Sequence, residues 1–356
     1  MRVLITGICG FVGATIARQL LNECEGVELF GLDNLSRSGS QLNLEPLREL
    51  GADIRIGDIR NPEDLAQFGD IDWVLGAAAN PTVTAGVEGG GSSAFDVLDQ
   101  NLVGSLRVLD FCKDRRIPLM HLSTSRVFSV AALAEIPVEV HEGAFRPKEG
   151  APFPVGVSSH GLSEGFSTAP PVSIYGSSKL AFEHIAQEYS LAFDFPVWIN
   201  RCSVMGGAGQ FGRADQGIFS YWIHSWVEKK PLRYLGFGGT GHQVRDGFHP
   251  KDLVRLLLQQ LEAGSDKSKP QLVNLGGGAP NAISLAQLSS WCRENISEYK
   301  VIEDGVERKF DAPWIVHDSR LAKEVWGWEP EIGLDRVLEE ILEHARKNPN
   351  WLETTQ

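Results

Sequence analysis

The sequence predicts an α/β fold, in which a doubly wound parallel sheet is followed by a smaller C-terminal α/β domain. Short apolar segments alternate with amphipathic helical segments over the first 200 residues. The first apolar segment runs directly into a glycine-rich turn, and from about residue 205 helices are separated by loops rich in glycine and aromatic residues. Alternation of strands and helices implies right-handed parallel crossovers, so the first region should form one sheet with helices on both faces.

The elements follow in order from this pattern. "RVLIT" at 2–6 is a continuous apolar run, as expected for a strand buried on both faces, and a helical pattern follows it at 11–21. The same criteria predict further strands at 27–33, 53–58, 72–78, 118–124 and 196–201. They predict further helices at 40–50, 61–67, 95–113 and 173–192.

The second region is expected to form the smaller domain, over the carboxyl edge of the sheet. We assign 1–200 to the first domain and 201–356 mainly to the second, and the chain can cross between them near 245–280. Predicted helices in this region are 216–228, 250–261 and 284–297, and predicted strand segments lie near 232–248 and 271–275. Composition predicts loops at 80–93 and 129–171. Three tryptophans are expected in the core of the smaller domain: Trp314, Trp326 and Trp328.

Composition excludes several classes of protein. The 356 residues include no apolar run of eighteen, and no basic leader precedes the first strand, so we expect no membrane span and no signal peptide. A formal charge of −13 argues against a nucleic-acid partner. The five cysteines are scattered, which favours reduced thiols in the cytoplasm over disulfides or a metal site.

The motif "TGICGFVG" predicts a dinucleotide site. It places Gly7, Gly10 and Gly13 between the first strand and the first helix, where the backbone can approach a pyrophosphate. Asp33 ends the second strand, and a carboxylate there suits the ribose hydroxyls of NAD and repels the 2′-phosphate of NADP. Arg37 is the one nearby residue that would suit NADP. The predicted cofactor is therefore NAD.

The spacing Gly-x-x-Gly-x-x-Gly, together with "YGSSK" at 175–179, resembles the extended short-chain dehydrogenase/reductases, a Rossmann-type family of nucleotide-sugar epimerases and dehydratases. The resemblance covers nearly the whole chain, including "GDIRN" (57–61), "RDGFHPKDL" (245–253) and "VNLGGG" (273–278). It implies a set of NAD-binding residues: Gly7, Cys9, Gly10, Phe11, Val12, Gly13, Asp33, Asn34, Ser36, Arg37, Asp58, Ile59, Ala77, Ala78, Ala79, Asn101, Tyr175 and Lys179.

The same resemblance implies a catalytic set of Thr124, Tyr175 and Lys179. Tyr175 and Lys179 are four apart on a predicted helix and therefore share a face. A free phenol has a pKa near 10, and lowering it by about three units requires roughly 4 kcal/mol of preferential phenolate stabilisation. We expect the ammonium of Lys179 and the positive nicotinamide ring to supply it together. Tyr175 would then accept a proton from a sugar hydroxyl that Thr124 hydrogen-bonds.

The residues after Thr124 bear on the type of reaction. Dehydratases of this family carry Asp-Glu there, whereas this chain has Ser125 and Arg126, which cannot act as that acid/base pair. We therefore expect epimerisation. The family pattern places Arg245 and Arg308 on the substrate diphosphate, and Arg201 is either a ligand contact or part of a structural ion pair. The implied substrate-binding residues are Thr124, Ser125, Arg201, Gln210, Gln216, Arg245 and Arg308.

Three segments resemble those of the CDP-paratose (CDP-tyvelose) 2-epimerases: "LDNLSR" (32–37), "GLSEGFSTAPPVSIYG" (161–176) and "RCSVMGGAGQFGRADQG" (201–217). The expected substrate is a CDP- or UDP-hexose, and the expected assembly is a homodimer or homotetramer in which the helices at 95–113 and 173–192 pair. The alternative activity is UDP-hexose 4-epimerisation. A 4,6-dehydratase or a non-catalytic NAD-sensing regulator fits these residues less well.

Overall fold

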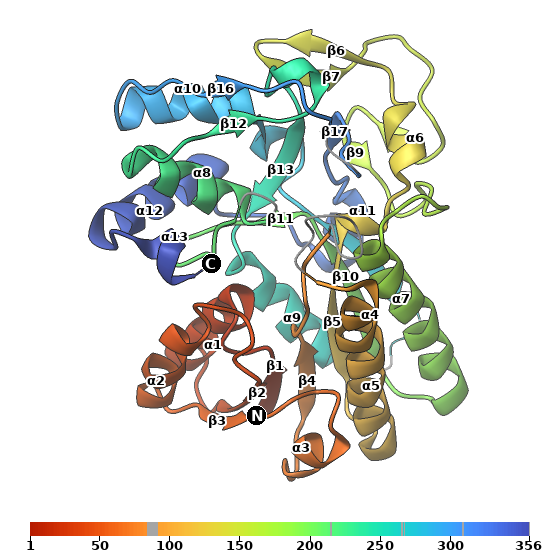
Figure 1. The fold of residues 1–356 in the computed structure, drawn as a ribbon. Coiled ribbons are helices and arrows are strands. Elements are labelled where there is room, and N and C mark those ends of the chain that lie inside the picture. The colour runs from red at the N-terminus through yellow and green to blue at the C-terminus, as the bar shows by residue number, and fades with distance from the viewer. Residues whose placement is uncertain (84–91, 214–215, 265, 267, 308–309, 356) are drawn as a thin grey trace.

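A computed structural model describes residues 1–83, 92–213, 216–264, 266, 268–307 and 310–355. Within these residues, the largest unit is a seven-stranded parallel sheet in the order β14-β10-β5-β4-β1-β2-β3 (Figure 1). Its strands, in chain order, are β1 (Arg2–Thr6), β2 (Glu28–Asp33), β3 (Asp53–Ile56), β4 (Trp73–Gly76), β5 (Leu119–Thr124), β10 (Val197–Cys202) and β14 (Leu272–Leu275). The doubly wound sheet that the alternating pattern predicts is confirmed.

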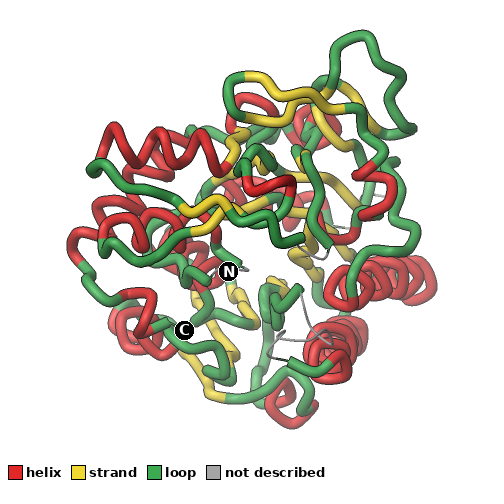
Figure 2. The backbone as a smooth tube through the Cα atoms, turned by 45° about the horizontal axis from the view of Figure 1, so that its top comes forward, coloured by secondary structure: helices red, strands yellow, loops and turns green. Residues whose placement is uncertain are grey.

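Helices cover both faces of the sheet, as Figure 2 also shows. One face packs against α1 (Phe11–Glu23), α2 (Gln41–Glu49), α9 (Asp252–Ala263) and α11 (Arg320–Trp326). The other packs against α3 (Pro62–Ala66), α5 (Gly104–Arg115) and α7 (Ile174–Phe193). The predicted helix at 95–113 is three joined segments: α4 (Ala94–Leu98), the π-helical η1 (Asp99–Val103) and α5.

Two elements in the second half of the chain belong to this sheet layer. The strand β14 pairs in parallel with β10 at one edge of the large sheet, and most of its residues are buried. The amphipathic helix α9 packs beside α1. Both lie within 245–280, the stretch where the sequence analysis allows the chain to cross between the two domains. Trp326 and Trp328 likewise pack in the core of the large sheet, where the Trp326 ring meets Trp198 edge-on, so the prediction that they fill the smaller domain is wrong.

The second layer is built around a small mixed sheet. The strands β11 (Val204–Met205), β15 (Ala282–Ser284) and β17 (Trp314–Ile315) assemble with β13 (Val244–Phe248) at its centre. A separate apolar core joins three helices, α8 (Ile218–Val227), α10 (Leu285–Asn295) and α12 (Leu334–Lys347). The chain then ends in α13 (Trp351–Thr354), which lies between the two layers in Figure 1. Shorter elements of this region are β12 (Arg233–Tyr234), η3 (Phe237–Gly239), η4 (Ala279–Asn281) and β16 (Ile302–Glu303).

The segment 129–171 is not the loop that its composition predicts. It contains α6 (Val130–Ala134), the hairpin strands β6 (Val138–His141) and β7 (Ala144–Pro147), and the two-residue strands β8 (Val157–Ser158) and β9 (Gly161–Leu162). Its apolar side chains pack against β13 and β17. The segment therefore supports the second layer from one side. Among the described residues, no helix is both long and apolar enough to cross a bilayer.

Candidate active site

The turn between β1 and α1 requires glycine for steric reasons. Gly7 has a φ of +73°, and a Cβ there would lie 2.6 Å from the Cα of Ala78. A Cβ on Gly13 would lie 2.3 Å from the carbonyl oxygen of Gly7. A side chain on Gly7 would therefore push the turn away from the segment after β4, and one on Gly13 would push α1 away from the turn. The glycines bring the helix N-terminus to the carboxyl edge of the sheet, where it can receive an anionic group.

Asp33 is oriented by the same turn. Its carboxylate accepts hydrogen bonds from the backbone N–H groups of Cys9 and Leu35, both at 2.9 Å. Burial raises the pKa of Asp33, and these hydrogen bonds oppose that rise. Cys9 therefore acts through its backbone, while its side chain is buried outside the cavity described below. The assignment of Cys9 to the cofactor site stays a prediction, and in this structure its thiol is buried away from the cavity.

The neighbouring rim carries Asn34 and Asp58. The Asn34 amide donates to the Asp58 carboxylate at 2.8 Å, and Arg60 donates to the same carboxylate. These contacts, led by the hydrogen bond from Arg60, lower the pKa of Asp58 to about 2. Asp58 is therefore a permanent anion within a fixed network, which suits a group that accepts hydrogen bonds from a nucleoside.

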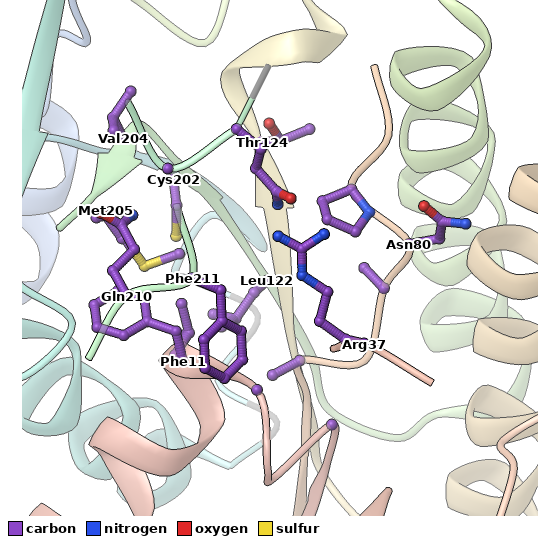
Figure 3. Close-up of a pocket in the computed structure, with 18 of the residues that line it drawn as sticks. Phe11, Arg37, Asn80, Leu122, Thr124, Cys202, Val204, Met205, Gln210 and Phe211 are labelled. Atoms are coloured by element: carbon purple, nitrogen blue, oxygen red, sulfur yellow. Dashed lines mark hydrogen bonds between the residues drawn. The ribbon is translucent and has the colours of Figure 1, made fainter. Parts of the chain in front are cut away.

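One cavity of about 420 Å³ joins this rim to the second layer. Figure 3 shows Arg37 reaching into it from one side and Cys202, Met205, Gln210 and Phe211 facing it from the other. Most of the sequence-predicted cofactor residues line it: Gly7, Gly10, Phe11, Val12, Gly13, Asp33, Asn34, Ser36, Arg37, Asp58, Ile59, Ala77, Ala78, Ala79, Tyr175 and Lys179. The cavity also contains the predicted substrate residues Thr124, Ser125, Gln210, Gln216 and Arg245.

Asn101 is not part of the cavity lining. Its side chain is buried in η1 and binds the backbone of Asn80 twice, accepting from its N–H at 2.7 Å and donating to its carbonyl at 2.8 Å. Asn80 itself does line the cavity. Asn101 thus holds the loop after β4, and its assignment to the cofactor site stays a prediction.

Thr124 and Tyr175 meet at the centre of the cavity. Thr124 ends β5, and Tyr175 lies in the first turn of α7, which Ser173 caps by accepting from the N–H of Gly176 at 3.0 Å. The two hydroxyl side chains are hydrogen-bonded to each other. Burial nevertheless raises the pKa of Tyr175, and the hydrogen bond from Thr124 is the largest opposing contribution. In the protein alone, the phenol is thus held neutral.

Lys179 lies one turn further along α7 and is 2 % exposed. Its ammonium donates to the carbonyl oxygen of Leu122 at 3.1 Å and lies 3.4 Å from the Nε2 atom of His121. Burial lowers the pKa of Lys179 to about 8, and the charge of Glu183 opposes that shift. We expected Lys179 to be a main cation for the Tyr175 phenolate. Its ammonium is directed at β5, and its role toward the Tyr175 phenolate stays a prediction.

The substrate side of the cavity is more polar than the sequence indicated. Gln210 donates to the carbonyl oxygen of Met205 at 2.6 Å, which fixes the loop after β11. Arg245 is bound to Asp311, with 2.6 Å between Nη2 and Oδ1, and Asp311 also lines the cavity. Arg308 lies outside the described residues. Asp311 was missed because nothing in its local sequence marks it, and its partner lies 66 residues earlier, on β13.

Arg201 has the structural role that was one of its two alternatives. It is 5 % exposed and forms a buried ion pair with Glu183, with 2.6 Å between Nη2 and Oε2. The Glu183 carboxylate also accepts from the Ser123 hydroxyl at 2.5 Å. Since Arg201 is absent from the cavity lining, its assignment as a substrate-binding residue is corrected.

The C-terminal segment also reaches the cavity walls, which the sequence did not indicate. The indole of Trp351 donates to the carbonyl oxygen of Gln210 at 2.9 Å, and the Ser38 hydroxyl donates to the carbonyl oxygen of Thr354 at 3.2 Å. Trp351 and Thr354 both belong to α13. This helix therefore connects the loop that follows β2 with the loop that follows β11.

Comparisons with known proteins agree with this arrangement. Residues 3–276 match the model of the "NAD dependent epimerase/dehydratase family". The chain is 26% identical over 353 residues to CDP-paratose 2-epimerase of Salmonella typhi, covering 93% of this chain and 95% of that protein. It is 26% identical over 356 residues to UDP-glucuronate 4-epimerase of Thermodesulfobacterium geofontis, covering 97% and 96%. It is 23% identical over 383 residues to dTDP-glucose 4,6-dehydratase of Escherichia coli, covering 100% and 96%.

Solved structures share the fold over the full length. A dTDP-glucose 4,6-dehydratase from Bacillus anthracis in complex with NAD is 22% identical, covers 100% of both chains and has a TM-score of 0.75. A UDP-glucose 4-epimerase from Bifidobacterium longum in complex with NAD⁺ and UDP is 20% identical, covers 99% of this chain and 100% of that one, and has a TM-score of 0.77. At these identities the likeness establishes the two-layer fold.

Proposed function

Because the chain belongs to the NAD dependent epimerase/dehydratase family, whose cofactor is NAD, we propose that it is a nucleotide-sugar epimerase. The reaction inverts one carbon of a nucleotide-linked hexose, and we assign it to carbon 2 of a CDP-sugar. The observation that carries the proposal is the meeting of Thr124, Tyr175 and Lys179 in the cavity that also contains the glycine turn and Asp33.

The residues present suit NAD. A Cβ on Gly7 or Gly13 would collide with the backbone of Ala78 or of Gly7, so glycine at these positions lets the N-terminus of α1 lie at the sheet edge, where it can receive a pyrophosphate. The carboxylate of Asp33, held by two backbone N–H groups, is oriented to accept from ribose hydroxyls. When bound, NAD supplies reversible hydride transfer, so that one carbon can be oxidised and then reduced without net redox change.

Tyr175 and Thr124 act on the reacting hydroxyl of the sugar. The threonine hydroxyl orients the oxygen, and the Oη atom of Tyr175 accepts its proton as the carbonyl forms and returns it as the carbonyl is reduced. The high pKa of the phenol in the protein alone means that positive charge near Tyr175 must favour the phenolate when the site is loaded. Lys179, whose pKa is about 8, lies on the same face of α7 as Tyr175.

Inversion requires that the sugar ring turn in the site, so that the carbon to be inverted loses hydride from one face and receives it on the other. Arg245 and the polar groups beside it can fix the nucleotide half while the ring turns, because a guanidinium binds phosphate oxygens in a defined geometry. Directly after Thr124, the lining residues Ser125 and Arg126 offer no carboxylate. This favours return of the hydride over elimination of water.

The choice of a 2-epimerase acting on a CDP-sugar is supported by sequence. The segments 161–176 and 201–217 resemble those of CDP-paratose 2-epimerases, and the Salmonella typhi enzyme is similar over 93% of this chain. A second candidate, 4-epimerisation of a UDP-hexose, is supported by the similar UDP-glucuronate 4-epimerase and would use the same three residues on another carbon.

We also propose a homodimer that pairs α4, α5 and α7 with their copies. The segment formed by α4, η1 and α5, together with α7, carries large apolar side chains that are exposed in the single chain: Phe95, Val103, Ile174, Leu191 and Phe193. Apolar side chains gathered on neighbouring helices are typical of an interface. Sedimentation velocity distinguishes a dimer from a monomer or a tetramer.

The proposed activity is tested by substrate identity and product structure. Thermal denaturation with CDP, UDP and dTDP should show the largest increase in Tm with CDP, because a ligand that binds the folded state stabilises it. CDP- and UDP-hexoses are then incubated with the NAD-loaded protein, and products are identified by NMR. A carbon-2 epimer of a CDP-hexose supports the proposal. A carbon-4 epimer of a UDP-hexose favours the second candidate, and a 4-keto-6-deoxy product refutes both.

A further inference from the structure

The C-terminal residues contact one loop from each layer beside the cavity. We call residues 350–355 the clasp; it contains α13 and lies between the two layers in Figure 1. Among the described residues that line the cavity, none belongs to the clasp. We propose that the clasp couples the cofactor side of the cavity to its substrate side, with Trp351 as a positioning residue for Gln210 and Phe211. This inference rests on the proposed function and adds a link between its two ligand sites.

The clasp is fixed to the second layer at its start. The Trp351 ring packs edge-on against His344 of α12, with 4.6 Å between the ring centres. It also lies over the ring of His224 of α8, at an interplanar angle of 27°. The backbone N–H of Asn350 donates to the Glu228 carboxylate, directly after α8, at 3.0 Å. These contacts hold the clasp against α8 and α12, so its end extends toward the sheet layer.

On the substrate side, Trp351 holds the loop after β11. The indole N–H of Trp351 and the hydroxyl of Ser220 both donate to the carbonyl oxygen of Gln210, at 2.9 Å and 2.7 Å. The ring centre of Trp351 lies 6.1 Å from that of Phe211. Gln210 and Phe211 are both buried and face the cavity (Figure 3). The position of Trp351 therefore helps to set the position of this wall.

On the cofactor side, the end of the clasp meets the loop after β2. The Ser38 hydroxyl donates to the carbonyl oxygen of Thr354 at 3.2 Å. Gly39 has a φ of +94°, and a Cβ there would lie 2.7 Å from the Cγ2 atom of Thr355 and 3.1 Å from the ring of Phe211. The clasp and the two loops therefore meet at Gly39, in contact too close for a side chain.

This contact makes the two ligand sites dependent on each other. Arg37 reaches into the cavity from the loop after β2, and Gln210 faces it from the loop after β11 (Figure 3). A dinucleotide that orders the first loop should also order the clasp and, through Trp351, the second loop. Less conformational entropy is then lost when the nucleotide-sugar binds. By linkage, each ligand should raise the affinity for the other by the same factor.

The test measures NAD binding to stripped, full-length protein by calorimetry, with and without a saturating nucleoside diphosphate. CDP, UDP and dTDP are used in turn. With a nucleotide that binds, we expect the affinity of wild type for NAD to rise about fivefold or more, the lower end of typical coupling between sites. Trp351→Phe keeps an aromatic ring and loses the N–H that donates to Gln210, so in this variant the ratio of the two affinities should fall toward one.

Trp226→Phe is the matched control. The indole N–H of Trp226 also donates to a backbone carbonyl, that of Ser297, at 2.9 Å, and Trp226 is absent from the cavity lining. This variant should lose a similar hydrogen bond and keep the wild-type ratio. The inference is overturned if wild type shows no coupling with a nucleotide that binds, if Trp351→Phe keeps the wild-type ratio, or if Trp226→Phe loses it equally.

A second measurement uses NAD alone and follows hydrogen exchange by mass spectrometry. The backbone N–H groups of Glu353, Thr354 and Thr355 donate within the clasp, so their exchange reports its opening. NAD should slow this exchange, although the clasp lies outside the cavity lining. Ser38→Ala removes the hydroxyl that donates to Thr354 and should weaken the protection. Exchange in wild type that does not respond to NAD would overturn the inference.

These outcomes separate the inference from the proposed reaction. Coupling with UDP or dTDP in place of CDP would support the clasp and refute the assignment to a CDP-sugar. If none of the three nucleotides binds, the proposed function fails, and exchange in the clasp with NAD alone decides the inference. Where turnover is measured, Trp351→Phe should raise KM more than it lowers kcat, because the loop after β11 carries none of the three proposed catalytic residues. A fall in kcat with KM unchanged would contradict a positioning role on the substrate side.

Discussion

The ammonium of Lys179 donates a hydrogen bond to the backbone carbonyl oxygen of Leu122 across 3.1 Å, in a fully buried setting. Burial lowers the pKa of this lysine to about 8, below the value of about 10.4 in an unfolded chain. Between these two values the unfolded state binds more protons than the folded state, so this group makes stability rise with pH from about 8 to about 10.4. Below pH 8 the lysine is charged in both states, and its unfavourable contribution to the free energy of unfolding is largest and no longer changes with pH.

Lys179→Met should therefore be stabilised relative to wild type most strongly at pH 7. Removing the buried charge should raise the free energy of unfolding by on the order of 3 kcal/mol. The carbonyl of Leu122, left without its donor, should offset about 1–3 kcal/mol of that gain. The difference in unfolding free energy between the two proteins should shrink as pH rises to 10. Urea denaturation at pH 7, 8.5 and 10 measures it, with the exposed Lys323→Met as control. Parallel pH dependences for Lys179→Met and wild type would contradict the shifted pKa.

Asp33→Ala should change the choice of cofactor. Removing the carboxylate abolishes its hydrogen bonds to ribose and its repulsion of a 2′-phosphate, so the affinity for NAD should fall more than that for NADP. Calorimetric titration of the stripped protein with both dinucleotides gives the two affinities. The backbone N–H groups of Cys9 and Leu35 also lose their acceptor, so some loss should be common to both. Equal loss for NAD and NADP would mean that Asp33 only holds the turn.

Glu183→Ala should destabilise the fold strongly. Arg201 would remain buried without its partner, and breaking a buried ion pair in this way costs about 3–5 kcal/mol. Arg201→Ala should cost a similar amount, and the double variant less than the sum. The pair between Arg336 and Glu339, more than half exposed on both sides, is the matched control, and its loss should cost less than about 1 kcal/mol. Similar losses at both sites in urea denaturation would refute the structural role of Arg201.

Tyr175→Phe should preserve the fold and the bound NAD while turnover falls by about 10²–10⁴, the range for loss of a general base. The ring keeps its buried position and loses only the hydroxyl that bonds Thr124. Single-turnover kinetics on NAD-loaded protein separate this loss from weaker substrate binding. Turnover close to wild type would assign the proton transfer to another group.

Most of the sheet was predictable because its central strands β1, β4, β5 and β10 are buried nearly throughout and read as apolar runs. The strand at 2–6 and the helix that begins at Phe11 follow directly from periodicity and the glycine turn. Strands of only two residues, such as β8 and β9, carry no periodic signal, so 129–171 was predicted as a loop. The place of β14 depended on pairing with β10, which is a tertiary property.

The candidate site was predictable where one motif brings its residues together. Tyr175 and Lys179 are on one helix, and the glycines are in one turn, so spacing alone sets their geometry. Contacts between distant segments were not predictable. The partner of Arg201 is Glu183 on another element, and the direction of the Lys179 ammonium toward Leu122 depends on how α7 packs on β5.

The most direct test of the central claim follows the carbon-bound hydrogen during inversion. The nucleotide-sugar identified as the substrate is prepared with deuterium on the carbon that is inverted and is incubated with NAD-loaded protein in ordinary water. Proton transfer at Tyr175 concerns only the oxygen, so the deuterium should leave and return as hydride and remain on that carbon in the epimer. NMR and mass spectrometry should show the label retained. An epimer that has lost its deuterium to solvent would show inversion by proton exchange, and would contradict the account.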